Sequence, residues 1–163
     1  GKVPILVHGD TWVSESLAIS EYLAESFPVP EHPQIFPAHP AQRARARQIM
    51  SFLRTSLFAL REARPTITIF FQPTTAAMSA KAKEEAADLE RIALAVIPEG
   101  RTTMFEHWCI ADADLGLALM RLVANQDPIA PHLVNYARAQ FDRPSVKKFL
   151  SYVPPTPYVP PGH

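Results

Sequence analysis

Residues 1–27, GKVPILVHGDTWVSESLAISEYLAESF, decide the fold of this chain. Apolar residues at positions 3–7 predict a short buried strand, and the HGDT segment that follows supplies Gly and Asp for a tight turn. Residues 11–13 predict a returning strand, after which apolar residues recur with the period of a helix until Pro28. The sequence therefore predicts a hairpin followed by one helix. Because a lone hairpin is marginally stable in water, it must lie against other structure.

The start of the predicted helix, SES, can be interpreted in two ways. In the simpler one, Ser14 is the N-cap and Glu15, in the first turn, complements the helix dipole. In the other, the free N–H groups and the Ser16 hydroxyl bind a carboxylate while Glu15 binds an ammonium group. A ligand with an α-amino-acid end would satisfy both side chains. Taken alone, the motif favours capping.

The Val3–Pro4 bond offers a similar choice. A proline at the start of a strand is tolerated at a sheet edge, and a trans bond is the more common form. A cis bond would leave the Val3 N–H and C=O free to pair with an extended peptide, as in strand addition. From these residues alone, the trans form is favoured.

The rest of the chain differs in pattern from this first part. Five prolines between positions 28 and 40 exclude a regular helix and predict a linker. Residues 65–73, PTITIFFQP, predict an ordered apolar connection, with a strand as the alternative, and the Pro-rich residues 153–163 predict an extended or disordered tail. Helical periodicity and composition predict five helices, over residues 41–64, 79–97, 109–125, 131–141 and 143–153.

The composition of the chain limits the classes of function that it can have. Lys plus Arg equals Asp plus Glu at 16 each, so the formal net charge is zero, which argues against nucleic acid or an anionic membrane as partner. No stretch is apolar for long enough to span a bilayer. A single cysteine, Cys109, excludes an internal disulfide, and together with the lack of a signal peptide it favours the cytoplasm.

Familiar catalytic motifs are missing from the sequence. It contains no glycine-rich phosphate loop, no Cys-x-x-Cys, no His-Glu-x-x-His and no Gly-x-Ser-x-Gly. The six histidines lack metal-ligand spacing, so no metal is expected. Arg43 and Arg47 share a helix face and Arg45 does not, and we expect them in solvent or at a subunit interface.

GKVPIL, followed after a hairpin by ESLAISEYLAESFP, resembles the glutathione S-transferase superfamily. The resemblance implies an α+β chain: a partial thioredoxin-like hairpin plus helix, followed by an all-α helical bundle. It also implies domain limits. Residues 1–28 are the remnant of the glutathione-binding domain, 29–40 the linker, 41–152 the helical domain and 153–163 the tail. WCIAD and RPTITIFFQP resemble a bacterial subgroup, the YfcF-like transferases.

The resemblance assigns roles to single residues. It implies that Val3 pairs its backbone with the cysteinyl part of glutathione next to a cis Pro4, that Glu15 and Ser16 hold the γ-glutamyl end, and that Lys2 reaches the glycyl carboxylate. An electrophile pocket is implied over the helix from about Arg43 to Arg61, with Phe52 and Thr55 as candidates.

In FEHWCIADADLGLALMRL the resemblance implies a buried helix that starts with a capping box. Asp112 takes the acidic position, three residues after Cys109, and reaches back to the Cys109 N–H. A thiol is a poor acceptor beside a hydroxyl, so half of the box is expected to work. We assign Cys109 to this structural position and not to a nucleophile.

The implied function is that of a glutathione S-transferase. Glutathione is the cosubstrate, and its thiolate attacks a small electrophile or exchanges with a disulfide. We expect the catalytic thiolate stabiliser in an N-terminal strand–helix–strand segment that this chain lacks, so that the chain alone is inactive. The alternatives are a non-catalytic glutathione-transferase-like binding or assembly module and a plain helical bundle. The family also implies a homodimer, formed by residues 16–27 and the helices near 41–61 and 79–97.

Overall fold

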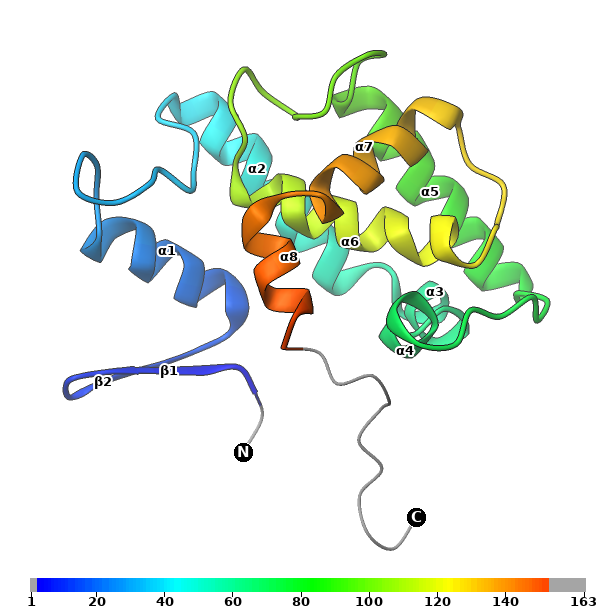
Figure 1. The fold of residues 1–163 in the computed structure, drawn as a ribbon, viewed down its shortest axis with the longest axis horizontal. Helices are drawn as coiled ribbons and strands as arrows, with labels where there is room; N and C mark the ends of the chain where they lie inside the picture. The colour runs from blue at the N-terminus through cyan, green and yellow to red at the C-terminus, as the bar shows by residue number, and fades with distance from the viewer. Residues whose placement is uncertain (1–2, 153–163) are drawn as a thin grey trace, which may run out of the picture.

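The computed structural model describes residues 3–152. They form a two-stranded hairpin with one helix beside it, and a larger group of seven helices next to this pair (Figure 1). The fold is therefore α+β, as the sequence predicts. Lys2 and the predicted tail over residues 153–163 lie outside the described residues.

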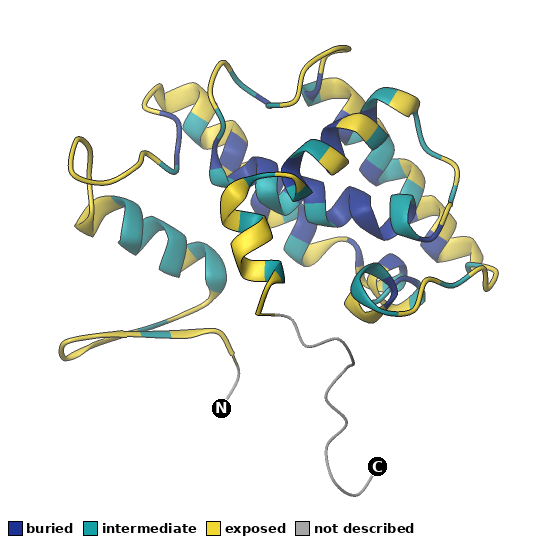
Figure 2. Ribbon diagram, viewed as in Figure 1, coloured by how far each residue is buried: buried dark blue, intermediate teal, exposed yellow. Residues whose placement is uncertain are grey.

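The hairpin consists of β1 (Ile5–His8) and β2 (Thr11–Ser14), which pair antiparallel from Ile5 opposite Ser14 to His8 opposite Thr11. Gly9 makes the turn with a φ of 58°, a left-handed conformation that glycine adopts without steric cost. The prediction of a buried first strand is wrong. Ile5 and Val7 are exposed because, within the described residues, the strand has one partner strand and only α1 over it (Figure 2).

Helix α1 (Ser16–Ser26) follows the hairpin and ends just before Pro28. The Pro-rich segment after it includes a cis bond between Val29 and Pro30 and contains no regular element. This segment docks onto the helical group, because Phe36 is buried in the core and the Ile35 carbonyl accepts a hydrogen bond from the Ile110 N–H at 2.8 Å.

The single helix predicted over residues 41–64 is two helices, α2 (Pro40–Thr55) and α3 (Phe58–Ala63). The break lies at Ser56 and Leu57, and it lets Leu57 turn its side chain into the core. It also frees the first-turn N–H groups of α3. One of them, that of Leu60, donates to the buried Glu85 carboxylate at 2.9 Å, which satisfies both groups.

Residues 65–73 were predicted to be an ordered apolar connection, with a strand as the alternative, and they instead include a short helix, α4 (Thr66–Phe70). Pro65 precedes it, and the Thr68 hydroxyl donates to the Pro65 carbonyl at 2.8 Å. Asn125 then donates to the Thr68 hydroxyl at 2.8 Å. Polar contacts with a distant part of the chain thus fix this turn.

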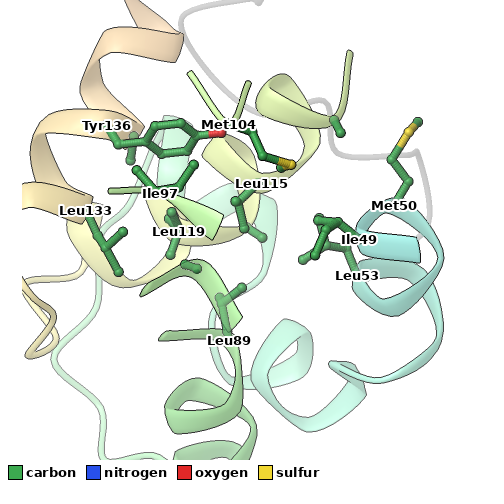
Figure 3. Close-up of a cluster of buried hydrophobic side chains, with 14 of the residues drawn as sticks. Ile49, Met50, Leu53, Leu89, Ile97, Met104, Leu115, Leu119, Leu133 and Tyr136 are labelled. Atoms are coloured by element: carbon green, nitrogen blue, oxygen red, sulfur yellow. The ribbon is translucent and has the colours of Figure 1, made fainter. Parts of the chain in front are cut away.

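The remaining helices were predicted within a few residues: α5 (Ala80–Val96), α6 (Ile110–Ala124), α7 (Pro131–Phe141) and α8 (Pro144–Leu150). Helix α6 is apolar nearly all round and lies at the centre of the group, where it contacts α2, α4, α5 and α7 (Figures 1 and 2). Figure 3 shows the core around it, to which α2, α5 and α7 contribute Ile49, Met50, Leu53, Leu89, Leu133 and Tyr136.

Candidate glutathione and cosubstrate site

The N-terminus of α1 is an open helix end whose entry residue is Glu15. Ser14, predicted to be the N-cap, is instead the last residue of β2, because it pairs with Ile5 across the hairpin. The N-cap is Glu15, with φ 68° and ψ 118° and no side-chain capping bond. A left-handed φ is uncommon for a residue with a side chain and concentrates at functional sites. The conformation leaves the Glu15 side chain exposed at the helix end.

Ser16, the first residue of α1, is held from the helical group. Its hydroxyl oxygen accepts a hydrogen bond from Arg54 Nε at 2.9 Å, and Arg54 in turn pairs with Asp114 at 2.5 Å and donates to the Met50 carbonyl at 2.8 Å. Because the hydroxyl oxygen of Ser16 accepts here, its hydrogen remains available to donate to a ligand. Burial raises the pKa of Asp114, and the hydrogen bond from Arg54 opposes that change.

A second contact fixes α1 against α2. Glu21 accepts hydrogen bonds from Arg43 at 2.9 Å and from Arg47 at 2.7 and 2.8 Å. The hydrogen bond from Arg47, with that from Arg43, lowers the pKa of Glu21 in spite of its burial. Arg43 and Arg47 therefore hold the two parts of the chain together, and Arg47 keeps 46% of its side chain exposed to solvent. The expectation that they lie at a subunit interface stays a prediction.

The hairpin places Val3 at the edge of the same region. Val3 is 89% exposed, and the Val3–Pro4 bond is cis, as the family resemblance implies and contrary to the interpretation from the residues alone. Strand β1 begins at Ile5, so Val3 is not part of the ladder between β1 and β2. The backbone groups of Val3 therefore precede the paired part of the strand.

A cavity of about 210 Å³ begins at Ser16 and continues between α2, α3 and α6. Leu53 and Arg54 of α2 line it, but Phe52 and Thr55 do not. Phe52 is half-buried against the core, and the Thr55 hydroxyl donates to the Ser51 carbonyl at 3.0 Å. The assignment of these two residues to an electrophile pocket stays a prediction. The lining of the cavity is Ser16, Leu53, Arg54, Leu57, Arg61, Asp114, Leu117, Ala118 and Arg121.

The start of α6 is built around a fully buried carboxylate. Asp112 accepts hydrogen bonds from the N–H groups of Cys109 at 2.8 Å and Met104 at 2.7 Å, and from the Tyr136 hydroxyl at 2.8 Å. Cys109 is buried, and burial, with the charge of Asp112, raises the pKa of its thiol to about 12. A protonated, buried thiol is a poor nucleophile, and this position is structural.

Residues 3–152 lack two features that would suggest other kinds of function. No helix there combines the length and apolar character needed to cross a membrane. The same residues contain no group of three or more His, Cys, Asp or Glu side chains placed to hold a metal ion.

The elements described above define a class of protein: a β-hairpin and helix of thioredoxin-like type, joined by a Pro-rich linker to a helical domain. Family models agree with this division. The glutathione S-transferase C-terminal domain matches residues 40–154 and the glutathione S-transferase N-terminal domain matches residues 1–25. The chain belongs to the glutathione S-transferase family.

Two solved structures show which members of the family this chain resembles. The chain is 35% identical to a glutathione transferase homologue from Burkholderia, solved with bound glutathione; the match covers 92% of this chain and 72% of that one, with a TM-score of 0.74. A Tau class glutathione S-transferase from mango shares the fold at 22% identity and a TM-score of 0.66, over 91% of this chain and 70% of that one.

Among curated proteins, glutathione S-transferase U12 of Arabidopsis thaliana is 44% identical over 57 residues, which are 35% of this chain. Those residues make up 22% of the plant protein, so the match spans about a fifth of its length. The YfcF-like subgroup stays a prediction.

The sequence pointed to Glu15 and Ser16 but not to the side chains that surround them. Arg54 is 38 residues from Ser16 and 60 residues from Asp114, and none of the three stands in a spaced motif with the others. The available signal is the presence of charged residues, Asp114 and Arg121 among them, within a largely apolar helix, since polar groups inside a core require a partner.

Proposed function

We propose that this protein binds glutathione at the N-terminus of α1 and uses it as a cosubstrate. The observation that carries the proposal is the Ser16 hydroxyl, which Arg54 holds at an open helix end beside the exposed Glu15. Helix N-termini attract carboxylates through their free N–H groups and the dipole. The bound glutathione in the Burkholderia homologue, 35% identical, supports the same ligand here.

In this proposal the γ-glutamyl end of glutathione lies across the helix start. Ser16 donates its hydroxyl hydrogen to the α-carboxylate, and Glu15 accepts from the α-ammonium group. The cysteinyl part pairs with the backbone of Val3, beside the cis Pro4. Lys2, assigned to the glycyl carboxylate, lies outside the described residues.

The reaction that we propose for the whole protein is attack by the glutathione thiolate on a small electrophile. The sulfur forms the new bond, the leaving group takes the electron pair of the bond that breaks, and the thiol proton goes to solvent. Exchange with a disulfide is the second form, in which one thiolate replaces another at sulfur. The group that stabilises the thiolate is not among the residues assigned above, and a non-catalytic binding or assembly module is the alternative function.

Calorimetric titration with glutathione tests the binding. We expect Glu15→Ala and Ser16→Ala each to weaken the affinity about tenfold, because each removes a hydrogen bond to a charged group. Glu25→Ala and Ser26→Ala, two exposed residues at the opposite end of the same helix, are matched controls and should leave the affinity unchanged. Unchanged affinity in both Glu15→Ala and Ser16→Ala would remove the site assignment.

We further propose that the protein is cytoplasmic and forms a homodimer through residues 16–27 and the helices α2 and α5. The fold supports this proposal because α1 lies at one end of the molecule, next to α2 (Figure 1). Two-fold pairing uses the same surface on both subunits, so one patch on each chain is enough.

A further inference from the structure

The cavity next to Ser16 is unusually rich in arginine. Four of its nine lining residues are charged: Arg54 of α2, Arg61 of α3, and Asp114 and Arg121 of α6. Three positive charges thus face one negative charge in a space of about 210 Å³. Most ligand pockets are predominantly apolar with a few polar groups, so this excess of positive charge needs an explanation.

The single carboxylate of the cavity, that of Asp114, already has an ion-pair partner. Asp114 pairs with Arg54 at 2.5 Å, which leaves the other two arginines without it. Neither Arg61 nor Arg121 takes part in an ion pair within residues 3–152. Arg61 donates weakly to the Arg54 carbonyl at 3.4 Å, a neutral acceptor.

Arg121 is the stronger indication, because the residue is only 8% exposed. One of its terminal nitrogens, Nη1, donates to the Arg64 carbonyl at 2.5 Å, and the side chain lines the cavity. Burial, together with the charge of Arg61, lowers the pKa of Arg121. A buried guanidinium without a counter-charge is costly, and an anion bound beside it would offset that cost.

We infer that this cavity binds the carboxylate of an anionic acceptor substrate, with Arg121 and Arg61 as its contacts. Guanidinium groups match carboxylates in shape and bind them through paired hydrogen bonds. Leu57, Leu117 and Ala118 line the same cavity and would contact an apolar body. The inference rests on the proposed function: glutathione occupies the Ser16 end, and an apolar acceptor that carries a carboxylate occupies the arginine end.

Glutathione has carboxylates of its own. The experiment must therefore distinguish a carboxylate of glutathione from the carboxylate of an acceptor substrate as the group that the arginines bind. The probes are 4-chloro-3-nitrobenzoate and its methyl ester, an aromatic pair that differs in the negative charge. S-Methylglutathione, whose sulfur is blocked, occupies the glutathione site without reaction. Affinities are measured by calorimetric titration of the full chain with each probe, with and without saturating S-methylglutathione.

We expect the acid to bind about tenfold more tightly than the ester, as one charge-assisted contact implies. Arg121→Met and Arg61→Gln should each reduce that preference several-fold. Arg61 is exposed, so its variant tests the site without disturbing the core. Arg91→Gln, an exposed arginine of α5 that pairs with Asp88, is the matched control and should keep the full preference.

Equal affinity for the acid and the ester would overturn the inference. Displacement of the acid by S-methylglutathione would also overturn it, because the arginines would then belong to the glutathione site itself. Binding of both ligands together supports the inference. If S-methylglutathione fails to bind while the preference for the acid persists, the proposed function fails and an anion site remains. The two failures are therefore distinguishable.

Discussion

Asp112 shows how one residue can organise a domain. Its carboxylate is fully buried and satisfies three donors, which come from the segment before α6, from the N-cap of α6 and from α7. Buried charged groups are tolerated when several hydrogen bonds replace the lost water. The position therefore joins the start of the central helix to its neighbours.

Replacement of this carboxylate should be among the most damaging changes in the chain. Asp112→Ala leaves two buried N–H groups and one hydroxyl without an acceptor, and we expect a loss of about 3 kcal/mol or more in the free energy of unfolding. Urea denaturation followed by circular dichroism measures it. Asp88→Ala, at an exposed ion pair, serves as the control, and a loss no larger than that of the control would refute this role for Asp112.

Cys109 gives a prediction on pH. The folded chain raises the thiol pKa from 9.0 to about 12, so the unfolded state releases its proton first. The contribution of the protonated Cys109 thiol to stability is complete below pH 9. It is lost as the pH rises through the folded pKa of about 12. Between these limits the free energy of unfolding should fall more steeply for the native chain than for Cys109→Ala. Parallel curves for the two proteins would contradict this.

At the scale of elements, periodicity and proline positions were enough to predict the hairpin, α1, and the four helices from α5 to α8. The break between α2 and α3 could not be predicted in this way, because it depends on Glu85, which lies 25 residues beyond Leu60 in the sequence. Helix α4 depends likewise on Asn125, 57 residues beyond Thr68. Local patterns carry no information on partners at these separations.

The packing of α6 against α7 depends on Gly116. A Cβ at Gly116 of α6 would lie 2.6 Å from Cγ and 2.7 Å from Cβ of Gln140 on α7. Gln140 cannot easily move away, because its side chain donates to the Thr102 carbonyl at 2.7 Å and accepts from the indole of Trp108 at 3.1 Å. Glycine is therefore required where α6 and α7 approach each other.

Gly116→Ala should accordingly destabilise the protein. Alanine gains about 1 kcal/mol in helix propensity, but overpacking costs roughly 1–3 kcal/mol, so we expect a net loss measured by thermal unfolding. A double-mutant cycle with Gln140→Gly provides the control, since the loss should shrink when the opposing side chain is absent. An increase in stability from Gly116→Ala alone would contradict this, because it would mean that α6 and α7 move apart to accept the methyl group at little cost.

For the whole molecule, long-range polar contacts join α1 to the helical domain. Glu21 connects α1 to α2, and Arg54 connects Ser16 to Asp114. The sequence predicted Glu15 and Ser16 as candidate ligand groups through the family resemblance. It could not predict the arginine cavity, because Arg61 and Arg121 meet only after the helices have packed.

The proposed homodimer gives a prediction at this scale. Light scattering after size exclusion, at micromolar concentration, should give twice the chain mass of 18.1 kDa. The reason is that an isologous interface through α1, α2 and α5 needs only a second copy of the same chain. A single-chain mass at that concentration would contradict the proposal.

We propose above all that glutathione binds at the start of α1, and amide chemical-shift mapping measures that binding residue by residue. A ¹H–¹⁵N spectrum of the labelled chain is recorded with increasing glutathione. We predict that the largest shifts fall on Val3, Glu15, Ser16 and the following residues of the first turn. The absence of shifts at saturating glutathione, or shifts centred on a distant surface such as α8, would contradict the claim.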